Sequence, residues 1–374
     1  MAGIYLHIPF CKKACYYCDF HFSTSLKKYD EILSSLKMEL ILRKDELKKE
    51  IIETIYFGGG TPSLLKVEDV EWLIEIIKTN YTVSETPEIT LEANPDDLSI
   101  EKIEALAKSP VNRLSIGIQS FYEEDLKLMN RAHNANEAKN CLTNATKYFD
   151  NITIDLIYGI PNMSNVQWKK NLQTAFDFGI THISSYALTV EPKTALDTFI
   201  KNGKYPNIDE TVAKEHFDIL VKETHKNGFI HYEISNFGKP DYFSKHNTSY
   251  WLGKKYIGIG PSAHSFNQTH RSWNIANNAK YIKALQNETL PNEVEKLTKE
   301  DQFNEYLMTG LRTIWGISLT KILNEFGETF CSKLLKSSQK FIDKGLLIIE
   351  NNTLKTTPKG KFLADGLASD LFII

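Results

Sequence analysis

The chain has 374 residues, 42% of them hydrophobic and 24% charged, which is ordinary for a globular protein and too apolar for a disordered one. Its 44 Lys and Arg residues nearly balance its 47 Asp and Glu residues, so no excess of positive charge favours nucleic acid as a partner. The apolar windows are far shorter than the ~20 residues of a membrane-spanning helix, so we expect contact with a membrane only through a partner protein.

The amino-terminal segment and the cysteines together indicate a reducing compartment. The first apolar run follows no basic segment and contains His7 and Pro9, so it does not resemble a secretory signal, and a cytoplasmic location is expected. Three of the five cysteines, Cys11, Cys15 and Cys18, lie close together. In such a compartment a cysteine group of this kind is more often metal-binding or catalytic than disulfide-bonded.

Short apolar runs alternate with longer amphipathic segments over the first half of the chain. Six runs are predicted to be strands: Gly3–Ile8, Thr54–Phe57, Glu88–Glu92, Arg113–Ile118, Ile152–Ile157 and His182–Leu188. The segments between them, such as Leu26–Lys48 and Val67–Thr79, carry apolar residues three and four apart, the pattern of a helix that covers a sheet.

Successive βα units form a parallel sheet, and six of them predict a partial (βα)6 barrel of the TIM type whose site gathers at the carboxyl ends of the strands. Cys11, Gly58–Gly60, Asn94, Gln119 and Gly159 each follow or end one of these runs. We therefore expect an α/β fold with its functional residues at that edge of the sheet.

The alternation weakens beyond about residue 190, where Val212–Lys226 still has a helical pattern. We divide the chain into a barrel core (1–235), an extension of the core (236–290) and a mainly helical carboxyl-terminal module (291–374). The module ends in an expected hairpin, Gly345–Glu350 and Thr353–Thr356, and a helix pair with such a hairpin resembles a winged helix.

The loop from Cys11 to Cys18 places three thiols at spacings of three and two intervening residues. Thiolates are soft ligands that suit zinc or an iron–sulfur cluster. With three ligands, a four-iron cluster keeps one iron open to an exogenous group. Two alternatives stay open at this point: a Cys3His zinc site completed by His21, and three cysteines that bind no metal.

The CxxxCxxC spacing with Tyr17 before the last cysteine resembles the signature of radical S-adenosylmethionine (SAM) enzymes. A longer set of motifs, in order along the chain, resembles the HemW-type heme chaperones, relatives of the oxygen-independent coproporphyrinogen III oxidases. These motifs are Tyr5-Leu-His-Ile-Pro-Phe-Cys11, Tyr17-Cys-Asp-Phe20, Phe57-Gly-Gly-Gly-Thr-Pro-Ser63, Glu92-Ala-Asn-Pro95, Ser115-Ile-Gly-Ile-Gln-Ser-Phe121, Asp155-Leu-Ile-Tyr-Gly-Ile-Pro161 and His246-Asn-Thr-Ser-Tyr-Trp251. The resemblance runs from residue 4 to about 265 and continues with a compatible carboxyl-terminal module.

This resemblance implies a [4Fe-4S] cluster on Cys11, Cys15 and Cys18, with SAM at its open iron. It implies a set of SAM-binding residues: Tyr5, Tyr17, Gly59, Gly60, Thr61, Glu92, Gln119, Arg131 and Asp155. Residue chemistry agrees in part, because glycines let a backbone approach a ligand and a buried Glu92 needs a partner. Taken alone, Arg131 and Asp155 would be a surface charge and a structural hydrogen-bonding group.

Three features favour the chaperone branch over the oxidase branch. The oxidases place a fourth cysteine two positions after the third, where this chain has Phe20. They also carry a substantial segment before the cluster, whereas Cys11 is the eleventh residue here. The third feature is the HNxxYW motif of the chaperones, which His246, Asn247, Tyr250 and Trp251 match.

The HNxxYW residues are the expected heme contacts, because imidazole is a common axial ligand of heme iron and aromatic rings stack on a porphyrin. A structural role for His246 is the competing interpretation, and His7 and His264 are alternative contacts. Cys141 and Cys331 have no spaced partners and are expected to be structural.

We thus expect a protein that binds heme as cargo and transfers it to an apo heme protein, a respiratory one among the candidates. The alternative is radical decarboxylation of coproporphyrinogen III, so enzymatic activity stays open at this stage.

Overall fold

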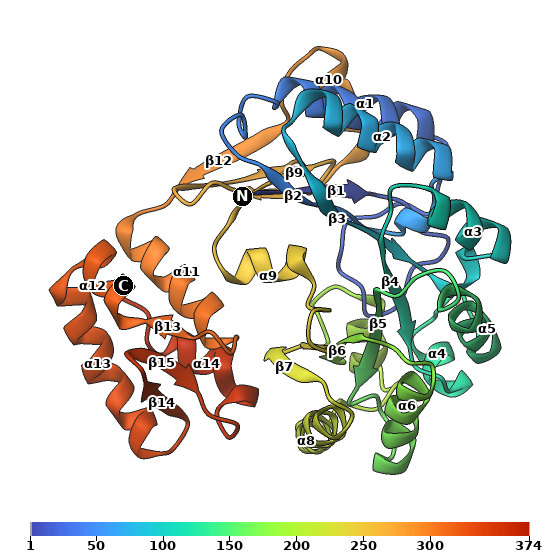
Figure 1. The fold of residues 1–374 in the computed structure, drawn as a ribbon. Helices are drawn as coiled ribbons and strands as arrows, with labels where there is room; N and C mark the ends of the chain where they lie inside the picture. Colours follow the sequence, from blue (N-terminus) through green and yellow to red (C-terminus); the bar gives the residue numbers. More distant parts are fainter. Residues whose placement is uncertain (1, 374) are drawn as a thin grey trace.

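A computed structural model describes residues 2–373 and contains one twelve-stranded sheet, in the order β12-β11-β10-β9-β1-β2-β3-β4-β5-β6-β8-β7 (Figure 1). Its six central strands are parallel and neighbours in sequence. They are β1 (Ala2–Ile8), β2 (Ile52–Gly59), β3 (Val83–Ala93), β4 (Arg113–Gln119), β5 (Ile152–Tyr158) and β6 (His182–Ala187). The predicted α/β fold with six βα strands is confirmed.

Helices connect these strands and cover the outer face of the curved sheet (Figure 1). They are α1 (Tyr29–Leu42), α2 (Val67–Asn80), α3 (Ile100–Lys108), α4 (Glu123–Leu128), α5 (Ala135–Ala145) and α6 (Asn165–Asp177), and α8 (Glu210–Lys226), which follows β6, packs beside α6. Helix α7 (Ala195–Lys201) lies against the cysteine loop instead, since the Leu196 N–H donates to the Tyr16 carbonyl at 2.8 Å. Cys141 is buried on α5, as expected of a structural cysteine.

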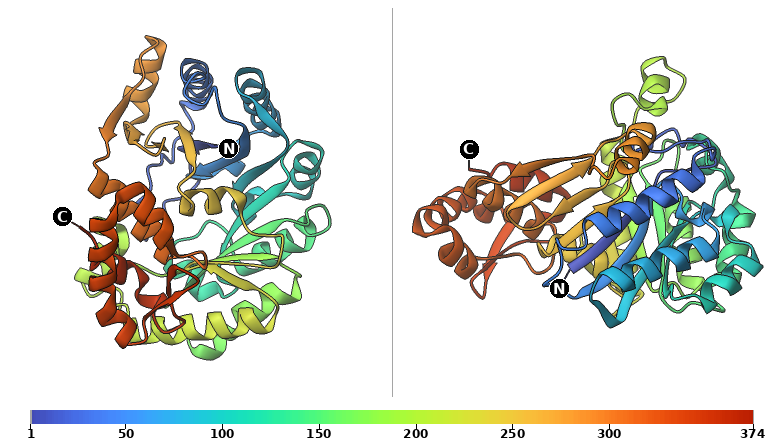
Figure 2. Two further views of the ribbon diagram at one scale, coloured as in Figure 1. Left: turned by 60° about the vertical axis from the view of Figure 1, so that its left-hand side comes forward. Right: turned by 90° about the horizontal axis from the view of Figure 1, so that it is seen from above.

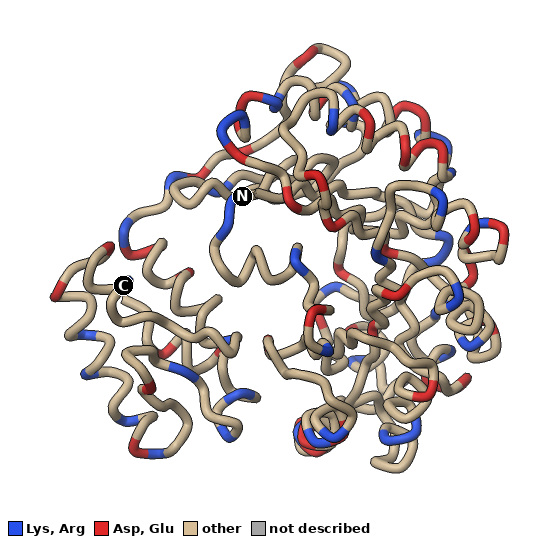
Figure 3. Tube along the Cα trace, in the orientation of Figure 1, with Lys and Arg blue, Asp and Glu red and all other residues tan. Residues whose placement is uncertain are grey.

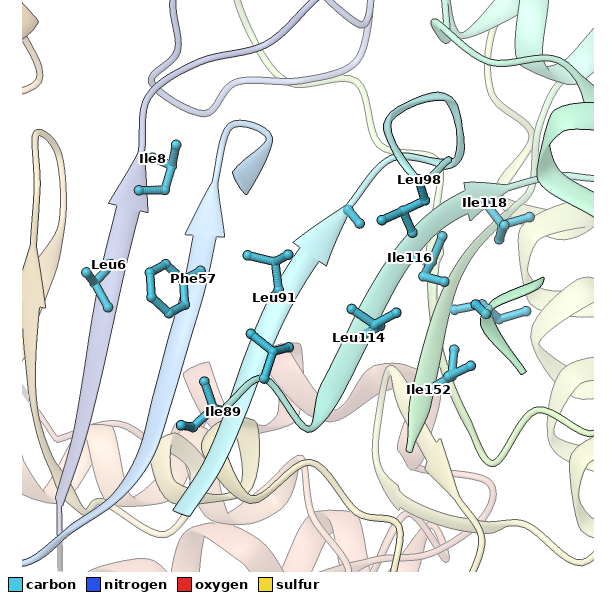
Figure 4. Close-up of a cluster of buried hydrophobic side chains, with 14 of the residues drawn as sticks. Leu6, Ile8, Phe57, Ile89, Leu91, Leu98, Leu114, Ile116, Ile118 and Ile152 are labelled. Carbon is cyan, nitrogen blue, oxygen red and sulfur yellow. The ribbon is translucent and has the colours of Figure 1, made fainter. Parts of the chain in front are cut away.

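The two faces of the central strands differ in chemistry. Alternate side chains such as Leu6, Phe57, Leu91, Leu114 and Ile152 form a continuous apolar layer (Figure 4). Because successive side chains of a strand point to opposite faces, the residues between them face the inside of the barrel. Those inner residues are largely polar or aromatic: Tyr5, Thr54, Tyr56, Glu88, Glu92, Arg113, Ser115, Thr153, Asp155, His182 and Ser184. A polar interior is thus built into the strands themselves.

The sheet continues beyond β1 through a segment that periodicity did not resolve into strands. These strands are β9 (Lys255–Ile259), parallel to β1, followed by β10 (His264–Phe266), β11 (His270–Asn274) and β12 (Asn292–Lys296). At the other edge lie β8 (Asn236–Gly238) and β7 (Ile230–Glu233). Helix α10 (Asn278–Gln286) packs on α1.

A buried carboxylate ties this extension to the first helix. Glu39 on α1 accepts hydrogen bonds from the Gly260 backbone N–H at 2.8 Å, Asn274 Nδ2 at 2.8 Å and the Tyr281 hydroxyl at 2.6 Å. Arg43, the residue that follows α1, forms an ion pair with it at 3.1 Å. A buried charge with this many partners is stable, so the extension is fixed to the core.

Helix α9 (Lys245–Trp251) lies inside the barrel, on the inner side of the sheet near the amino-terminal ends of the strands (Figure 1). It contacts β1 and β2. The Glu88 carboxylate of β3 accepts from the backbone N–H groups of Lys245 at 3.0 Å and His246 at 2.9 Å. The HNxxYW motif therefore occupies the end of the barrel opposite to the cysteine loop, which follows the carboxyl end of β1.

The carboxyl-terminal module has its own apolar cluster, which runs from Phe303 to Leu371. It contains α11 (Lys299–Leu311), α12 (Leu319–Phe326), α13 (Glu328–Asp343) and α14 (Ala364–Ser369), with an antiparallel sheet of β13 (Ile317–Ser318), β15 (Thr353–Thr356) and β14 (Leu347–Glu350). The module packs beside the barrel (Figure 2).

The expected hairpin is present, and its turn residues explain it. Asn351 and Asn352 both have positive φ, 48° and 58°, as a two-residue turn of the I′ type requires. Helices with a small antiparallel sheet agree with the predicted winged-helix-like module. The boundaries at residues 235 and 290 stay predictions, because β8, β9 and β12 all belong to the large sheet.

Both signs of charge are spread over the barrel and the module, as Figure 3 shows. Over residues 2–373, no helix is long and apolar enough to cross a membrane.

Candidate functional site

One cavity of about 440 Å³ lies at the carboxyl ends of the central strands. All three clustered cysteines line it, together with every predicted SAM residue except Tyr5: Tyr17, Gly59, Gly60, Thr61, Glu92, Gln119, Arg131 and Asp155. These residues come from five different strand ends and loops. The parallel topology brings them together because the carboxyl ends of parallel strands share one edge.

The cysteine loop is fastened to its surroundings at several points. The Cys11 backbone N–H donates to the Ser23 carbonyl at 3.0 Å, and the Tyr16 N–H donates to the Met129 carbonyl at 3.1 Å. Two thiol sulfurs accept hydrogen bonds: Cys11 Sγ from the Thr61 hydroxyl and Cys15 Sγ from Arg131 Nη1, both at 3.4 Å. The thiols therefore already face polar donors of the cavity wall.

The donor set fits an iron–sulfur cluster in its chemistry. Three soft thiols face a cavity large enough for more than one ion, and the buried Nε of Arg131 has no partner. In residues 2–373, no three His, Cys, Asp or Glu side chains stand where they could hold a metal ion, so loading requires the thiols to turn toward a common centre. Burial raises the pKa of Cys18 to about 11, so binding a metal there displaces a proton.

His21, the alternative fourth ligand of a zinc site, points elsewhere. Its Nε2 lies 2.7 Å from Asn278 Oδ1 on α10. The ring is thus used to attach the cysteine loop to the extension of the core.

The loop after β2 has glycine at two positions where its backbone passes very close to neighbouring residues. Gly59 has φ of 103°, and a Cβ there would lie 2.5 Å from His7 Nδ1. A Cβ on Gly60 would lie 2.5 Å from the Phe10 carbonyl oxygen, on the segment that leads into Cys11. Glycine is therefore required for the loop to pack against the cysteine loop while its backbone stays open to the cavity.

Arg131 connects four parts of the cavity wall. Its Nη2 donates to Asn94 Oδ1 at 2.7 Å and to the Gly117 carbonyl at 2.9 Å, while Nη1 reaches the Tyr17 hydroxyl at 3.4 Å as well as Cys15. This buried cation stands next to the cysteine loop, where it favours negative charge on the sulfurs or on a bound carboxylate.

Two carboxyl groups face the same cavity. Glu92 accepts from the Tyr56 hydroxyl at 2.8 Å and from the Gly59 N–H. Burial raises the pKa of Glu92 to about 7, with Asp155 adding to the shift, and burial likewise raises the pKa of Asp155 to about 7. Both groups are thus partly protonated near neutrality, and a cation in the cavity would favour their charged forms.

Gln119 lines the cavity in a strained backbone conformation, with φ of 65° at the end of β4 and a shift in register on its strand. Such outliers concentrate at functional sites. Neither this strain nor the cavity positions of Ser115 and Tyr186 were assigned from the sequence. Asn94, which was expected at this edge of the sheet, also lines the cavity.

Tyr5 lies below this cavity and does not line it. Its hydroxyl is 3.3 Å from His7 Nδ1, and its ring stacks on Tyr56 with 6.1 Å between centroids. In the structure Tyr5 therefore packs behind residues of the site. Its predicted direct contact with a cofactor stays a prediction.

His246 is buried and both ring nitrogens have partners. Nδ1 lies 2.7 Å from the Thr54 hydroxyl, and Nε2 lies 2.6 Å from the Tyr250 hydroxyl. Burial lowers the pKa of His246 to about 3, so the ring is neutral. Ligation of heme iron by this residue would require one of these two bonds to break, and the geometry favours the competing structural interpretation.

A second cavity of about 500 Å³ lies between the extension of the core and the carboxyl-terminal module. Tyr250 and Trp251 of the HNxxYW motif line it, whereas His246 and Asn247 do not. The remaining wall is rich in aromatic residues from both parts of the chain: Tyr256, Phe266, Tyr306 and Phe326. The motif thus contributes the rings of Tyr250 and Trp251 to the cavity wall, and His246 contacts Tyr250 from the barrel interior.

The other histidines considered for heme lie elsewhere. His7 is buried under the glycine loop, with Nε2 2.8 Å from the His21 carbonyl oxygen, and burial lowers its pKa to about 4. His264 is exposed on β10 and lines neither cavity.

Comparison with known proteins gives the same picture over nearly the full length. Residues 5–175 match the model of the Radical SAM superfamily, and residues 297–363 match that of the HemN C-terminal domain. The chain is 31% identical over 369 residues to the heme chaperone HemW of Bacillus subtilis (strain 168), covering 98% of this chain and 97% of the relative. It is 34% identical over 373 residues to the heme chaperone HemW of Lactococcus lactis subsp. lactis (strain IL1403), covering 97% of each.

Among solved structures, the coproporphyrinogen III oxidase (HemN) from Escherichia coli, a radical SAM enzyme, is similar with a TM-score of 0.86. The similarity covers 99% of this chain and 90% of that chain at 21% sequence identity. At this identity it shows a shared fold, including the barrel and the carboxyl-terminal module.

Proposed function

Because the chain belongs to the HemW family of the radical SAM superfamily, we propose that it is a heme chaperone, which binds heme as cargo and transfers it to an acceptor apoprotein. The observation that carries this proposal is the identity of 30–34% to HemW chaperones over nearly the whole length of both chains. Phe20 supports it, since this side chain is 67% exposed at the first cavity, at the position of the oxidases' fourth cysteine.

We assign the first cavity to a [4Fe-4S] cluster and SAM. Cys11, Cys15 and Cys18 would hold the cluster, and the polar wall would hold SAM. Such a cluster, when bound and reduced, would supply one electron that breaks the S–C5′ bond of SAM into methionine and a 5′-deoxyadenosyl radical. Arg131 and Tyr17 hold the loop beside the sulfurs, and Gly59, Gly60 and Thr61 line the cavity wall next to them.

Glu92 and Asp155 suit the positive charges of SAM, its ammonium and sulfonium groups. Both side chains are half-buried in the cavity wall, and desolvation raises the pKa of each to about 7, so a further cation there relieves the cost of their ionisation. Gln119 offers an amide at the same wall. These assignments make the cavity complementary to a zwitterionic, cationic ligand.

We assign heme to the second cavity, with Tyr250 and Trp251 as its contacts. A volume of about 500 Å³ lies within the range of about 300–1,000 Å³ typical of ligand pockets. Aromatic rings from α9, the sheet extension and the module can stack on a porphyrin plane. His246 and Asn247 would contribute through the helix that carries these rings.

An apo heme protein is the proposed acceptor, with the protein acting in the cytoplasm. The module that forms one wall of the second cavity is the part of the chain best placed to open for transfer, since its own apolar cluster lets it move as a unit.

Equilibrium titration with heme, followed by absorbance, tests the assignment. We expect Trp251→Leu to weaken heme binding about tenfold, because a stacked aromatic contributes roughly 1 kcal/mol or more beyond its buried area. Trp72→Leu, at a half-exposed tryptophan of α2, is the matched control and should bind heme as the unaltered protein does. Equal affinity in Trp251→Leu and the control would remove heme from this cavity.

The cluster is tested separately. Substituting Cys11, Cys15 and Cys18 by alanine should abolish iron incorporation on anaerobic reconstitution, whereas Cys141→Ala should retain it. Unchanged iron content in the triple variant would rule out this ligand set.

A further inference from the structure

A continuous line of side chains joins the two cavities through the barrel interior. It consists of Glu92, Tyr56, His246 and Tyr250, which we call the polar column. Glu92 lines the first cavity and Tyr250 lines the second. The two middle members line neither cavity; the functional assignments above give Tyr56 no role and His246 only an indirect one through α9.

Each step of the polar column is a direct contact. The Tyr56 hydroxyl donates to Glu92 Oε1 at 2.8 Å. The Tyr56 ring stacks on the His246 ring with 4.8 Å between centroids and 22° between planes. His246 Nε2 then lies 2.6 Å from the Tyr250 hydroxyl, and the two rings meet edge to face at 4.8 Å.

The column is closely packed where it passes two glycines of β1 and β2. A Cβ on Gly58 would lie 2.8 Å from the Tyr5 ring and 3.1 Å from Glu92 Oε1. A Cβ on Gly3 would lie 2.7 Å from the Thr54 hydroxyl and 3.2 Å from the His246 ring. Glycines thus occur where the column is most tightly packed, and close-packed interiors transmit displacements.

His246 is also fixed from two other sides. Thr54 holds Nδ1, and the Glu88 carboxylate holds the backbone N–H at 2.9 Å. With both nitrogens in use, a shift of the ring must alter the bond to Tyr250 or the one to Thr54. A displacement of Tyr56 thus has a direct path to Tyr250 through the His246 ring.

We propose that Tyr56 and His246 are positioning residues that couple the two cavities, so that a cation bound beside Glu92 tightens the binding of an aromatic ligand at Tyr250. The identity of the two ligands, SAM and heme, rests on the proposed function. A cation beside Glu92 favours its carboxylate form. The hydrogen bond that Glu92 accepts from Tyr56 then becomes stronger, since charge-assisted hydrogen bonds are stronger than neutral ones. Tyr56, His246 and α9 are then ordered before the second ligand arrives, which lowers the entropy that this ligand must lose.

The coupling is reciprocal, because it is a free energy shared by two binding equilibria. Heme must therefore tighten SAM binding by the same factor. Couplings of this kind are typically fivefold or more, so we expect about a fivefold change in each dissociation constant.

Two measurements on the anaerobically reconstituted protein test the proposal. Hydrogen exchange of the α9 amides, residues 245–251, is followed with and without SAM and needs no heme. Heme titration is then performed with and without SAM. Tyr56→Phe and Tyr250→Phe keep each ring and remove one hydroxyl, cutting the column above and below His246. Tyr81→Phe, which loses a buried hydroxyl bond to the Leu40 carbonyl outside the barrel interior, is the matched control.

We expect SAM to slow α9 exchange and to lower the heme dissociation constant about fivefold in the unaltered protein and in Tyr81→Phe. Both effects should vanish in Tyr250→Phe, which leaves the first cavity intact, and in Tyr56→Phe. The proposal is overturned if SAM leaves α9 exchange unchanged, or if both effects persist in the two column variants. Absence of heme binding with a normal response of α9 would instead refute the chaperone function and leave the coupling standing.

Discussion

Glu92 and Asp155 show how individual side chains give the first cavity its chemistry. Every second side chain of β3 and β5 points into the barrel, and Glu92 and Asp155 are among these. Both side chains line the cavity at the carboxyl edge of the sheet. Their position relative to the strands could be predicted from the sequence, and so could the cysteines and the glycine loop. Tyr5 and His246 could not, because their partners are set by side-chain packing inside the barrel.

A pH dependence of SAM affinity follows from these two carboxyl groups. Since burial raises the pKa of each to about 7, the charged forms that attract SAM prevail at pH 8 and are mostly lost at pH 6. We expect the SAM dissociation constant to rise by at least about tenfold from pH 8 to pH 6, because the charged fraction of each carboxyl falls from about nine-tenths to about one-tenth over this range. Equilibrium binding to the reconstituted protein measures it.

Glu92→Gln, which cannot ionise, should bind SAM more weakly at pH 8 and lose part of this dependence. A pH profile identical to that of the unaltered protein would contradict the role of Glu92. The same groups affect stability with the opposite sign: their contribution is fully present below about pH 4, where the unfolded chain is also protonated, and is lost as pH rises through about 7.

At the scale of elements, the six βα strands were predictable and α9 was not. The strands can be recognised from short apolar runs that alternate with amphipathic segments, a pattern that depends only on residues close together in the sequence. The position of α9 inside the barrel depends on contacts such as that between Glu88 and the Lys245 N–H, which are 157 residues apart. Periodicity contains no information on such pairs, and a seven-residue helix gives a weak local signal.

Glu88→Ala tests this attachment. The substitution leaves one buried and one part-buried N–H group of α9 without an acceptor, and the loss at a buried group costs about 1–3 kcal/mol. We expect the core to lose about 2–4 kcal/mol of unfolding free energy in denaturant titrations, with faster hydrogen exchange in α9. Glu293→Ala, at an exposed position of β12, is the control, and equal stability of the two variants would refute the anchoring role of Glu88.

At the scale of the whole molecule, Arg312 links the module, the core and the HNxxYW helix. Its Nε donates to the fully buried Glu233 of β7 at 2.9 Å, and Nη1 donates to Asp365 at 2.6 Å. The guanidinium also lies over the Trp251 ring, 4.9 Å from its centroid. The separate module could be predicted from the change in composition, but this junction could not, because its residues come from four distant parts of the chain.

Arg312→Ala should loosen the module. Removing one partner of a buried ion pair typically costs about 3–5 kcal/mol, here because the buried Glu233 side chain loses its hydrogen bond from the guanidinium. We expect faster limited proteolysis between the core and the module, and weaker heme binding because Trp251 loses its contact. Lys78→Ala removes an exposed ion pair to Glu75 and serves as the control. Identical proteolysis of both variants would contradict a junction at Arg312.

The most direct test of the chaperone function compares two ligands on the reconstituted, reduced protein: heme, which a chaperone would bind, and coproporphyrinogen III, which an oxidase would convert. The protein is incubated anaerobically with SAM and coproporphyrinogen III, and a parallel sample is titrated with heme. We predict saturable heme binding and no decarboxylated product. Repeated turnover of coproporphyrinogen III without heme binding would contradict the account and identify the protein as an oxidase.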